Sequence, residues 1–296
     1  MSSTPAAALL ERCTFAPAGS PLVCAVSGGP DSLALLALAV AAGVDAVAVH
    51  VDHGLRRGSA TEADVVADAS RRLGAAFRAE RVVVAPGPNL EARARAARRE
   101  VLGPEAATGH TMDDQAETVL LNLLRGAGLD GLAAMRRGPR HPLLGLRRSD
   151  THGLCRQLGL EPVRDPSNDD RRFTRNRVRH ELLPLCSAIA GRDVVPVLAR
   201  QCEVMAAEAD LLDALAEPLD ASDARRLSDA PDAVARRAAR RWLRNGSDHP
   251  PDLAAVERVL AVARGRYRAT EVVPGRRVRR SGGRLSMAPV RDSALR

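Results

Sequence analysis

The residues best suited to chemistry form one acidic cluster near the middle of the chain. The cluster contains His110, Asp113, Asp114 and Glu117. On a helix, the spacings of three, four and seven residues place these side chains on one face, close to the helix N-terminus. Carboxylates are favoured there by the helix dipole, and they can hold Mg²⁺ or an ammonium group. An acidic first turn that only caps the helix is the alternative that the pattern leaves open.

A second candidate site is a glycine-containing turn near the N-terminus. An apolar strand is expected over Leu22–Val26 and a helix over Leu33–Val40. The turn between them directs backbone N–H groups and a helix N-terminus at one point, which suits a phosphate or pyrophosphate. No G-x-x-x-x-G-K-[ST] string is present, so the kinase and GTPase class is disfavoured. A turn without a ligand is the alternative. The turn consists of Ser27, Gly28, Gly29, Pro30, Asp31 and Ser32.

Two further groups could serve the same site. Asp52 and His53 follow a predicted strand, where they could contact a ribose or base; a structural role is equally open. Arg175 and Arg179 lie four residues apart on a predicted helix, where they could neutralise a triphosphate or a leaving pyrophosphate. A solvated basic face is the more ordinary interpretation of such a pair in an arginine-rich chain.

The elements that must position these residues alternate between strand and helix. Parallel strands with right-handed crossovers are therefore expected in the first part of the chain. Because ligands of such sheets lie at the carboxyl ends of the strands, the strand ends at Ser27, Asp52 and His110 should face one crevice. The predicted strands cover residues 45–51, 77–84 and 106–110, and the predicted helices cover residues 60–73, 89–102, 113–125 and 174–186.

The composition changes near Gly191, which predicts two domains. Residues 1–190 form the α/β domain with the candidate site. Residues 191–296 are expected to form a smaller, mainly helical domain with a tRNA-binding or accessory role, which ends in short strands near residues 269–273 and 277–287.

The composition also narrows the class of protein. The 296 residues carry a net charge of +8 and contain no lysine, so all 44 basic residues are arginine. This charge favours a polyanionic partner. The arginines within residues 93–99 and 236–244 lie on predicted helix faces, which could contact the phosphates of a nucleic acid or be exposed to solvent. Five scattered cysteines without a C-x-x-C pair disfavour disulfide, iron–sulfur and zinc sites. No apolar run is long enough for a membrane span, so a cytoplasmic protein is expected.

Residues 27–32 resemble the S-G-G-x-D-S loop of the PP-loop ATP pyrophosphatases, enzymes that split ATP into AMP and pyrophosphate. A longer ordered set of motifs resembles the tRNA(Ile)-lysidine synthetases over roughly the first two-thirds of the chain. This resemblance implies a Rossmann-like fold of the adenine nucleotide alpha hydrolase type. The motifs are residues 27–32, 50–56, 89–95, 109–118, 124–128 and 165–179.

The resemblance also implies a reaction in two steps. ATP adenylates the wobble cytidine of tRNA(Ile) with a CAU anticodon and releases pyrophosphate; the side-chain amine of free L-lysine then displaces AMP. Residues 27–32 would bind ATP, with Asp31 on Mg²⁺ and Asp52 and His53 nearby. The acidic cluster would serve the reaction centre, and Arg175 and Arg179 would serve phosphate or the transition state. Glu117 is preferred for the lysine ammonium, and His110 or a carboxylate is the expected base.

Other functions remain open at this stage. A PP-loop tRNA thiolase usually needs catalytic cysteines, and an amidating synthetase would turn over ATP without RNA. A basic RNA-binding protein with a relic ATP site is a further alternative. A homodimer is also left open. Because the chain ends without the further C-terminal domain of longer relatives, tRNA discrimination is expected to rest on less protein.

Overall fold

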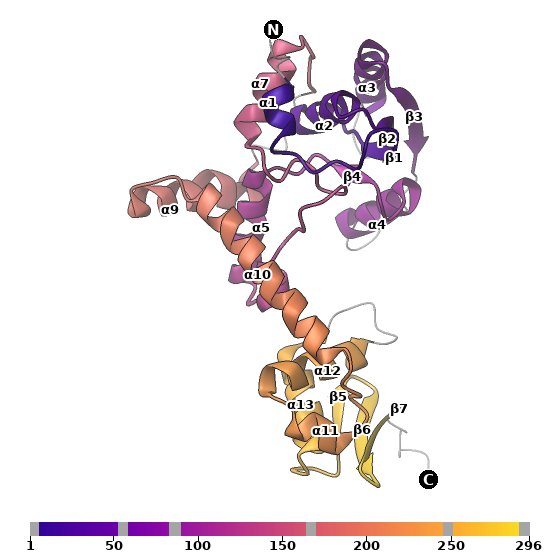
Figure 1. The fold of residues 1–296 in the computed structure, drawn as a ribbon, viewed down its shortest axis with the longest axis vertical. Helices are drawn as coiled ribbons and strands as arrows, with labels where there is room; N and C mark the ends of the chain where they lie inside the picture. The colour runs from indigo at the N-terminus through magenta and orange to yellow at the C-terminus, as the bar shows by residue number, and fades with distance from the viewer. Residues whose placement is uncertain (1–5, 53–58, 83–89, 164–169, 245–250, 290–296) are drawn as a thin grey trace. The chain divides into compact units, whose positions relative to one another are not determined.

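A computed structural model describes residues 6–52, 59–82, 90–163, 170–244 and 251–289 (Figure 1). The chain divides into two compact units, Met1–Met205 and Ala206–Arg296. The sequence predicts a boundary at residue 190, whereas this division falls inside the helix α10 (Val195–Ala216).

The first unit is built on a four-stranded parallel sheet in the order β3-β2-β1-β4. The strands are β1 (Pro21–Ala25), β2 (Asp45–Asp52), β3 (Ala76–Arg81) and β4 (Ala107–Thr108). This arrangement confirms the predicted α/β class and places the carboxyl ends of β1 and β4 side by side, because Ala25 pairs with Thr108. β3 is shorter than expected and ends at Arg81.

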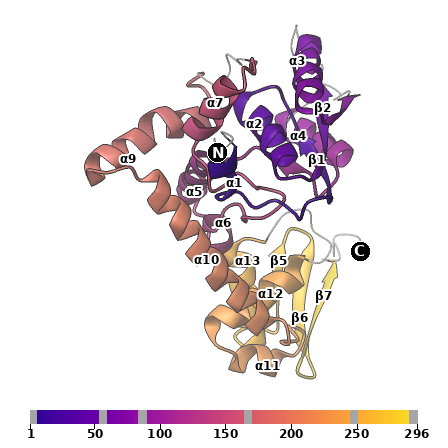
Figure 2. The same cartoon turned by 45° about the horizontal axis from the view of Figure 1, so that its top comes forward.

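Helices cover both faces of this sheet, as Figures 1 and 2 show. Alternate β1 residues divide between the two faces, with Leu22 and Cys24 packed on one side and Ala25 on the other. The first side is covered by α2 (Pro30–Ala41), α3 (Ser59–Leu73) and α7 (Arg148–Gln157), and the second by α4 (Leu90–Leu102). Most of α2 is buried, which accounts for its nearly continuous alanine and leucine sequence.

A separate core holds the rest of the unit together. There, Leu120 of α5 packs with Leu183 and Val195 from the segments that follow. The helix expected over 174–186 is found as two helices joined by a π-helical turn, a feature that is frequent at functional sites. The elements are α1 (Ala7–Leu10), α5 (Met112–Leu124), α6 (Leu129–Leu132), α8 (Thr174–Arg177), the π-turn (Val178–Leu182), α9 (Leu183–Ala190) and α10.

The second unit combines helices with a small antiparallel sheet in the order β5-β6-β7. One face of the sheet packs on the core of the unit, where Val272, Val278 and Leu285 are buried. The predicted strand-like segments are thus confirmed. The elements are α11 (Ala224–Asp229), α12 (Asp232–Arg244), α13 (Leu253–Ala263), β5 (Ala269–Val273), β6 (Arg276–Ser281) and β7 (Arg284–Pro289).

The arginines of α12 mostly serve the unit itself. Arg236 Nε lies 2.6 Å from a Glu257 carboxylate oxygen, and Arg237 Nε lies 2.6 Å from Asp213. Arg241 donates to two backbone carbonyls at the end of α10. These three side chains are therefore engaged within the unit instead of forming an unoccupied basic face.

Within the described residues, no single helix is long and apolar enough to cross a membrane; one bent pair, 174–190 with 195–216, meets the criteria of length and composition only.

Candidate active site

The turn after β1 is fixed by a left-handed glycine. Gly28 has φ +86°, a conformation that side chains disfavour. A Cβ at this position would also lie 3.1 Å from Val163 Cγ2, and the Gly28 carbonyl accepts a 3.0 Å hydrogen bond from the Val163 N–H. The glycine is therefore required both by the backbone angle and by the segment packed against it.

The same turn is closed by a serine at the start of α2. Ser32 Oγ donates to the Gly29 carbonyl at 2.8 Å and lies 3.1 Å from the Ser27 nitrogen, which donates to it. Pro30 is the first residue of α2, a position that suits proline because its missing N–H is not needed there. The Ser32 hydroxyl thus holds the loop in shape around the helix N-terminus.

The turn after β4 contacts the N-terminus of α2. A Cβ at Gly109 would lie only 2.6 Å from the backbone oxygen of Asp31, so the two chain segments pass too closely for a side chain. Immediately afterwards, Thr111 caps α5: its N–H and its hydroxyl each donate to Asp114 at 2.9 Å. Asp114 therefore has the capping role that the sequence left open, with one oxygen remaining for other contacts.

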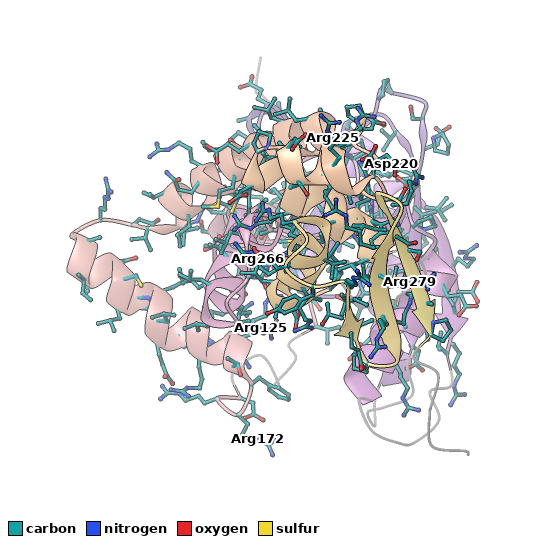
Figure 3. The ribbon with its side chains drawn as sticks, turned by 90° about the horizontal axis from the view of Figure 1, so that it is seen from below. Arg125, Arg172, Asp220, Arg225, Arg266 and Arg279 are labelled. Atoms are coloured by element: carbon teal, nitrogen blue, oxygen red, sulfur yellow. The ribbon has the colours of Figure 1, made fainter. Side chains whose placement is uncertain are left out.

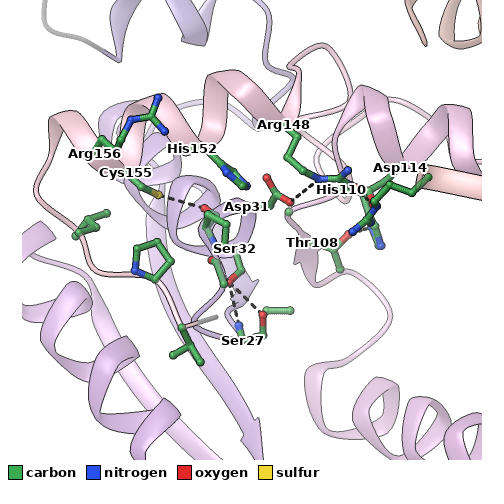
Figure 4. Close-up of a pocket in the computed structure, with 18 of the residues that line it drawn as sticks. Ser27, Asp31, Ser32, Thr108, His110, Asp114, Arg148, His152, Cys155 and Arg156 are labelled. Carbon is green, nitrogen blue, oxygen red and sulfur yellow. Dashed lines mark hydrogen bonds and ion pairs between the residues drawn. The ribbon is translucent and has the colours of Figure 1, made fainter. Parts of the chain in front are cut away.

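These two turns border one pocket of about 950 Å³ in the first unit (Figure 4). Its charged lining consists of four arginines and two aspartates, and three histidines and one threonine lie beside them. The lining includes Ser27, Gly29, Pro30, Asp31, Ser32, Arg98, Thr108, His110, Asp114, Arg148, His152, Arg156, Arg179 and His180.

Beneath this pocket lies a cluster of ion pairs centred on Glu117, whose side chain is 0% exposed. Arg175 Nε donates to Oε2 at 2.7 Å, and Arg179 Nε donates to Oε1 at 2.6 Å. Arg148 donates to Oε1 through both terminal nitrogens at 3.2 Å. Three guanidinium groups therefore surround one carboxylate, which has the geometry of a buried structural charge.

The two neighbouring aspartates belong to the same cluster. Asp114 Oδ1 accepts from Arg148 at 3.0 Å and from Arg175 at 3.1 Å. Asp113 accepts two 3.1 Å bonds from Arg147 and a 2.8 Å bond from the Arg148 backbone. Burial raises the pKa of each aspartate, but the arginines and hydrogen bonds outweigh burial, so both pKa values lie below the ordinary one.

Asp31 has a different environment. Its Oδ1 accepts a hydrogen bond from the Thr151 hydroxyl, and its Oδ2 lies 3.6 Å from Arg148 Nε. Burial raises the pKa of Asp31, and the Thr151 hydrogen bond and the Arg148 charge offset this only in part. Among the three aspartates of the site, Asp31 is thus the one whose negative charge is least compensated by the protein.

The comparisons with known proteins agree with this geometry. The PP-loop domain family matches residues 5–186. A tRNA(Ile)-lysidine synthase of Nocardia farcinica is 44% identical over 269 residues, which cover 84% of this chain and 85% of that protein. The chain belongs to the tRNA(Ile)-lysidine synthase family. The corresponding protein of Thermobifida fusca is 40% identical over 91% of this chain and 92% of its own length.

A solved structure, the U34-tRNA thiolase NcsA from Methanococcus maripaludis with its [4Fe-4S] cluster, has a similar fold. It matches with a TM-score of 0.50 and 16% identity, covering 64% of this chain and 73% of the thiolase. At that identity the likeness shows the fold alone.

In this lysidine synthase family member, the pocket brings together part of the predicted site. The loop residues other than Gly28, together with His110, Asp114 and Arg179, line it. Asp113, Glu117 and Arg175 lie in the ion-pair cluster instead, and Asp52 at the end of β2 is not among the lining residues. His53 and residues 164–169 lie outside the described residues.

Sequence reasoning missed the contribution of α7. Arg147 and Arg148 stand at the N-terminus of this helix, where the helix dipole disfavours positive charge. That conflict is a signal that the two arginines have specific acidic partners, which are Asp113, Asp114 and Glu117. His152 and Arg156 of α7 were also missed, whereas Arg98 was recognised only as part of a basic helix face.

Proposed function

We propose that this chain ligates lysine to the wobble cytidine of the CAU anticodon of tRNA(Ile), forming lysidine with release of pyrophosphate and AMP. The pocket is the observation that carries the proposal. It joins the PP-loop turn to His110, which precedes α5, and to Asp114 in the first turn of α5, so that a bound nucleotide would meet an acid–base group within one site. Membership of the lysidine synthase family supports the same reaction.

The charges around the pocket suit ATP. Arg148 and Arg179 reach it from the cluster, and Arg98 and Arg156 reach it from α4 and α7. Together with the N-terminus of α2, these groups would bind the triphosphate and stabilise the charge that develops as pyrophosphate leaves. The arginines thereby orient the α-phosphorus for attack by the cytidine.

Asp31 is suited to Mg²⁺. Magnesium is commonly held by one or two carboxylates together with substrate phosphates and water. No group of three potential ligands occurs among the residues that the structure describes, so the phosphates would have to complete the coordination. The poorly compensated charge of Asp31 fits this role, and a bound ion would supply further neutralisation of the phosphates.

For lysine, the contacts favour a different carboxylate from the one predicted. Glu117 is buried under three arginines and does not line the pocket. Asp114 does line the pocket, and its lowered pKa keeps it ionised at neutral pH. We therefore assign the lysine ammonium to Asp114, with His110 as the base that takes its proton before attack.

The second unit offers a surface for the tRNA backbone. Arg277 and Arg279 are exposed on the face of the β5–β7 sheet opposite the buried valines, and Arg279 is labelled in Figure 3. Arg279 pairs with Ala269 on one side and Ser286 on the other, so its guanidinium is flanked by small side chains. Tyr267, 60% exposed, precedes the sheet between two exposed arginines. Such a surface fits phosphates and an unstacked base.

Incubation with labelled lysine, ATP and a CAU-anticodon tRNA(Ile) transcript tests the proposed reaction. We expect incorporation that depends on ATP and on C34, with none into a matched UAU transcript. Absence of incorporation beside an active control enzyme would refute the reaction. ATP turnover without RNA would instead indicate an amidating synthetase.

The tRNA surface has a separate test with a charge-matched control. Replacing Arg277 and Arg279 by serine should weaken tRNA binding and lower the slope of log Kd against log salt by about two. Replacing Arg225 and Arg226, exposed on α11, removes the same charge and should leave the slope unchanged. Equal effects of the two double variants would exclude a specific tRNA surface on the β5–β7 sheet.

The homodimer and the cytoplasmic location stay predictions. Analytical ultracentrifugation of the purified protein tests whether it is a homodimer.

A further inference from the structure

Thr108 places a hydroxyl between two histidines beside the proposed active site. Its Oγ1 lies 2.7 Å from His110 Nδ1 and 2.8 Å from His141 Nδ1. The two rings are edge to face, with centroids 5.4 Å apart. Figure 4 shows Thr108 and His110 on the pocket wall. His141 contacts Thr108 but is not a lining residue.

The backbone fixes this arrangement. The Thr108 N–H donates to the Arg140 carbonyl at 2.9 Å, so the loop around residue 140 runs alongside β4. The His141 N–H closes the loop by donating to the Gly138 carbonyl at 2.9 Å. His141 is therefore held next to Thr108 by main-chain hydrogen bonds and not only by its own side chain.

A hydroxyl has one proton, so it can donate to only one of the two imidazole nitrogens. If Thr108 donates to His110 Nδ1, the proton of neutral His110 must lie on Nε2, and His110 cannot accept another there. If Thr108 donates to His141, then His110 Nδ1–H donates to Thr108, and the lone pair of His110 is on Nε2. The direction of the central hydrogen bond therefore decides whether His110 can act as a base.

The alternative acceptor for the hydroxyl is weaker. The Arg140 carbonyl lies 3.4 Å from Thr108 Oγ1, which is long for a hydroxyl donor. His141 at 2.8 Å is the better acceptor, provided that its Nδ1 carries no proton.

We propose that His141 is a positioning residue, which accepts the Thr108 hydrogen bond and thereby holds His110 in the tautomer with a basic Nε2. The inference rests on the proposed function for the identity of the reaction. His110 Nε2 takes a proton from the lysine ammonium, and the freed electron pair forms the C–N bond. The C–O bond to AMP breaks and AMP leaves with its electron pair. The nitrogen then gives a second proton to the departing phosphate or to water, so that the product keeps one N–H.

The charges around His110 and His141 support a hydrogen bond in which the Thr108 hydroxyl donates to His141. Burial, followed by the neighbouring charges of His110 and Arg140, lowers the pKa of His141 to about 4, so His141 stays neutral when His110 is protonated. Asp114 faces His110 from α5, and its negative charge stabilises the imidazolium. One histidine of the pair is thus kept as an acceptor while the other gains a proton.

The tautomers can be measured without any reaction. In ¹⁵N–¹H correlation spectra of the full chain at pH 7, we expect neutral His141 protonated at Nε2 and His110 protonated at Nδ1. Thr108→Val removes the hydroxyl and should abolish this preference in His110. A His141 protonated at Nδ1 would overturn the proposal, whether or not lysine is the substrate.

The kinetic test uses two nearly isosteric variants. His141→Asn places an amide oxygen where Nδ1 lies and should keep lysine transfer within about threefold, whereas His141→Leu should slow it about 10- to 100-fold. Pyrophosphate release without lysine should be unchanged in both. Equal loss in the two variants would overturn the positioning role. Failure of the wild-type enzyme to use lysine would refute the proposed reaction and leave the tautomer measurement as the deciding result.

Discussion

Replacement of Glu117 by glutamine distinguishes between two roles for this carboxylate: stabilising the fold and binding the lysine ammonium. Glutamine retains the shape of the side chain but removes the negative charge from the centre of three arginines. Breaking a buried ion pair by removing one partner costs about 3–5 kcal/mol. The side chains of Arg148, Arg175 and Arg179 are 21%, 32% and 22% exposed. They would regain some contact with water, so the lower end, about 3 kcal/mol, is expected.

This loss is measurable as a change in melting temperature. For a domain of the size of the first unit, 1 kcal/mol corresponds to about 2–4 °C, so Glu117→Gln should melt roughly 6–12 °C below the wild type. Circular dichroism on heating measures the shift, and lysine KM is determined at a temperature where both proteins are folded. An unchanged melting temperature together with a large increase in lysine KM would refute this reasoning and restore Glu117 as the lysine ligand.

Asp31→Asn, which also replaces a carboxylate by an amide, is the control for Glu117→Gln. Because burial raises the pKa of Asp31 above its ordinary value, ionisation of this group opposes folding at neutral pH. The amide should therefore melt at the wild-type temperature or above it, while pyrophosphate release falls sharply. A large loss of stability in this variant would show that Asp31 belongs to the structural cluster and not to the ligand site.

Two further predictions follow from the same contacts. Gly109→Ala should weaken ATP binding about tenfold or more, because its Cβ would push the turn after β4 away from Asp31; fluorescence titration with an ATP analogue measures this. Asp113 and Asp114 have lowered pKa values in the folded state, so their contribution to stability is present above the unfolded value of about 4 and is lost as the pH falls through the folded values. Denaturant unfolding at pH 7 and pH 3 should show that Asp113→Asn is more destabilising at the higher pH.

The local parts of the site could be predicted from the sequence. The turn at Ser27–Ser32 follows from a strand, a glycine pair and a helix that are consecutive in the chain, and the acidic first turn of α5 follows from helix periodicity. These predictions succeeded because each depends on short-range backbone geometry. The parallel sheet, but not the order of its strands, followed from the alternation of strands and helices.

The partners of the carboxylates could not be predicted in the same way. Arg148 is 31 residues from Glu117, and Arg179 is 62 residues from it, with several elements between them. Nothing in a helical spacing indicates which of many arginines reaches a given carboxylate. The prediction that both Arg175 and Arg179 bind phosphate considered only their common helix face, and therefore did not anticipate that Glu117 binds both.

The ion-pair cluster explains how an arginine-rich site can bind a polyphosphate and still discriminate between its carboxylates. Of the three guanidinium groups held by this fully buried carboxylate, those of Arg148 and Arg179 also reach the pocket. Fixing these side chains on Glu117 avoids the entropy cost of ordering them when ATP binds. The same contacts occupy Glu117 and leave Asp31 and Asp114 as the acidic groups of the pocket lining. The carboxylate that is fully buried and does not line the pocket is thus the one least able to receive a substrate.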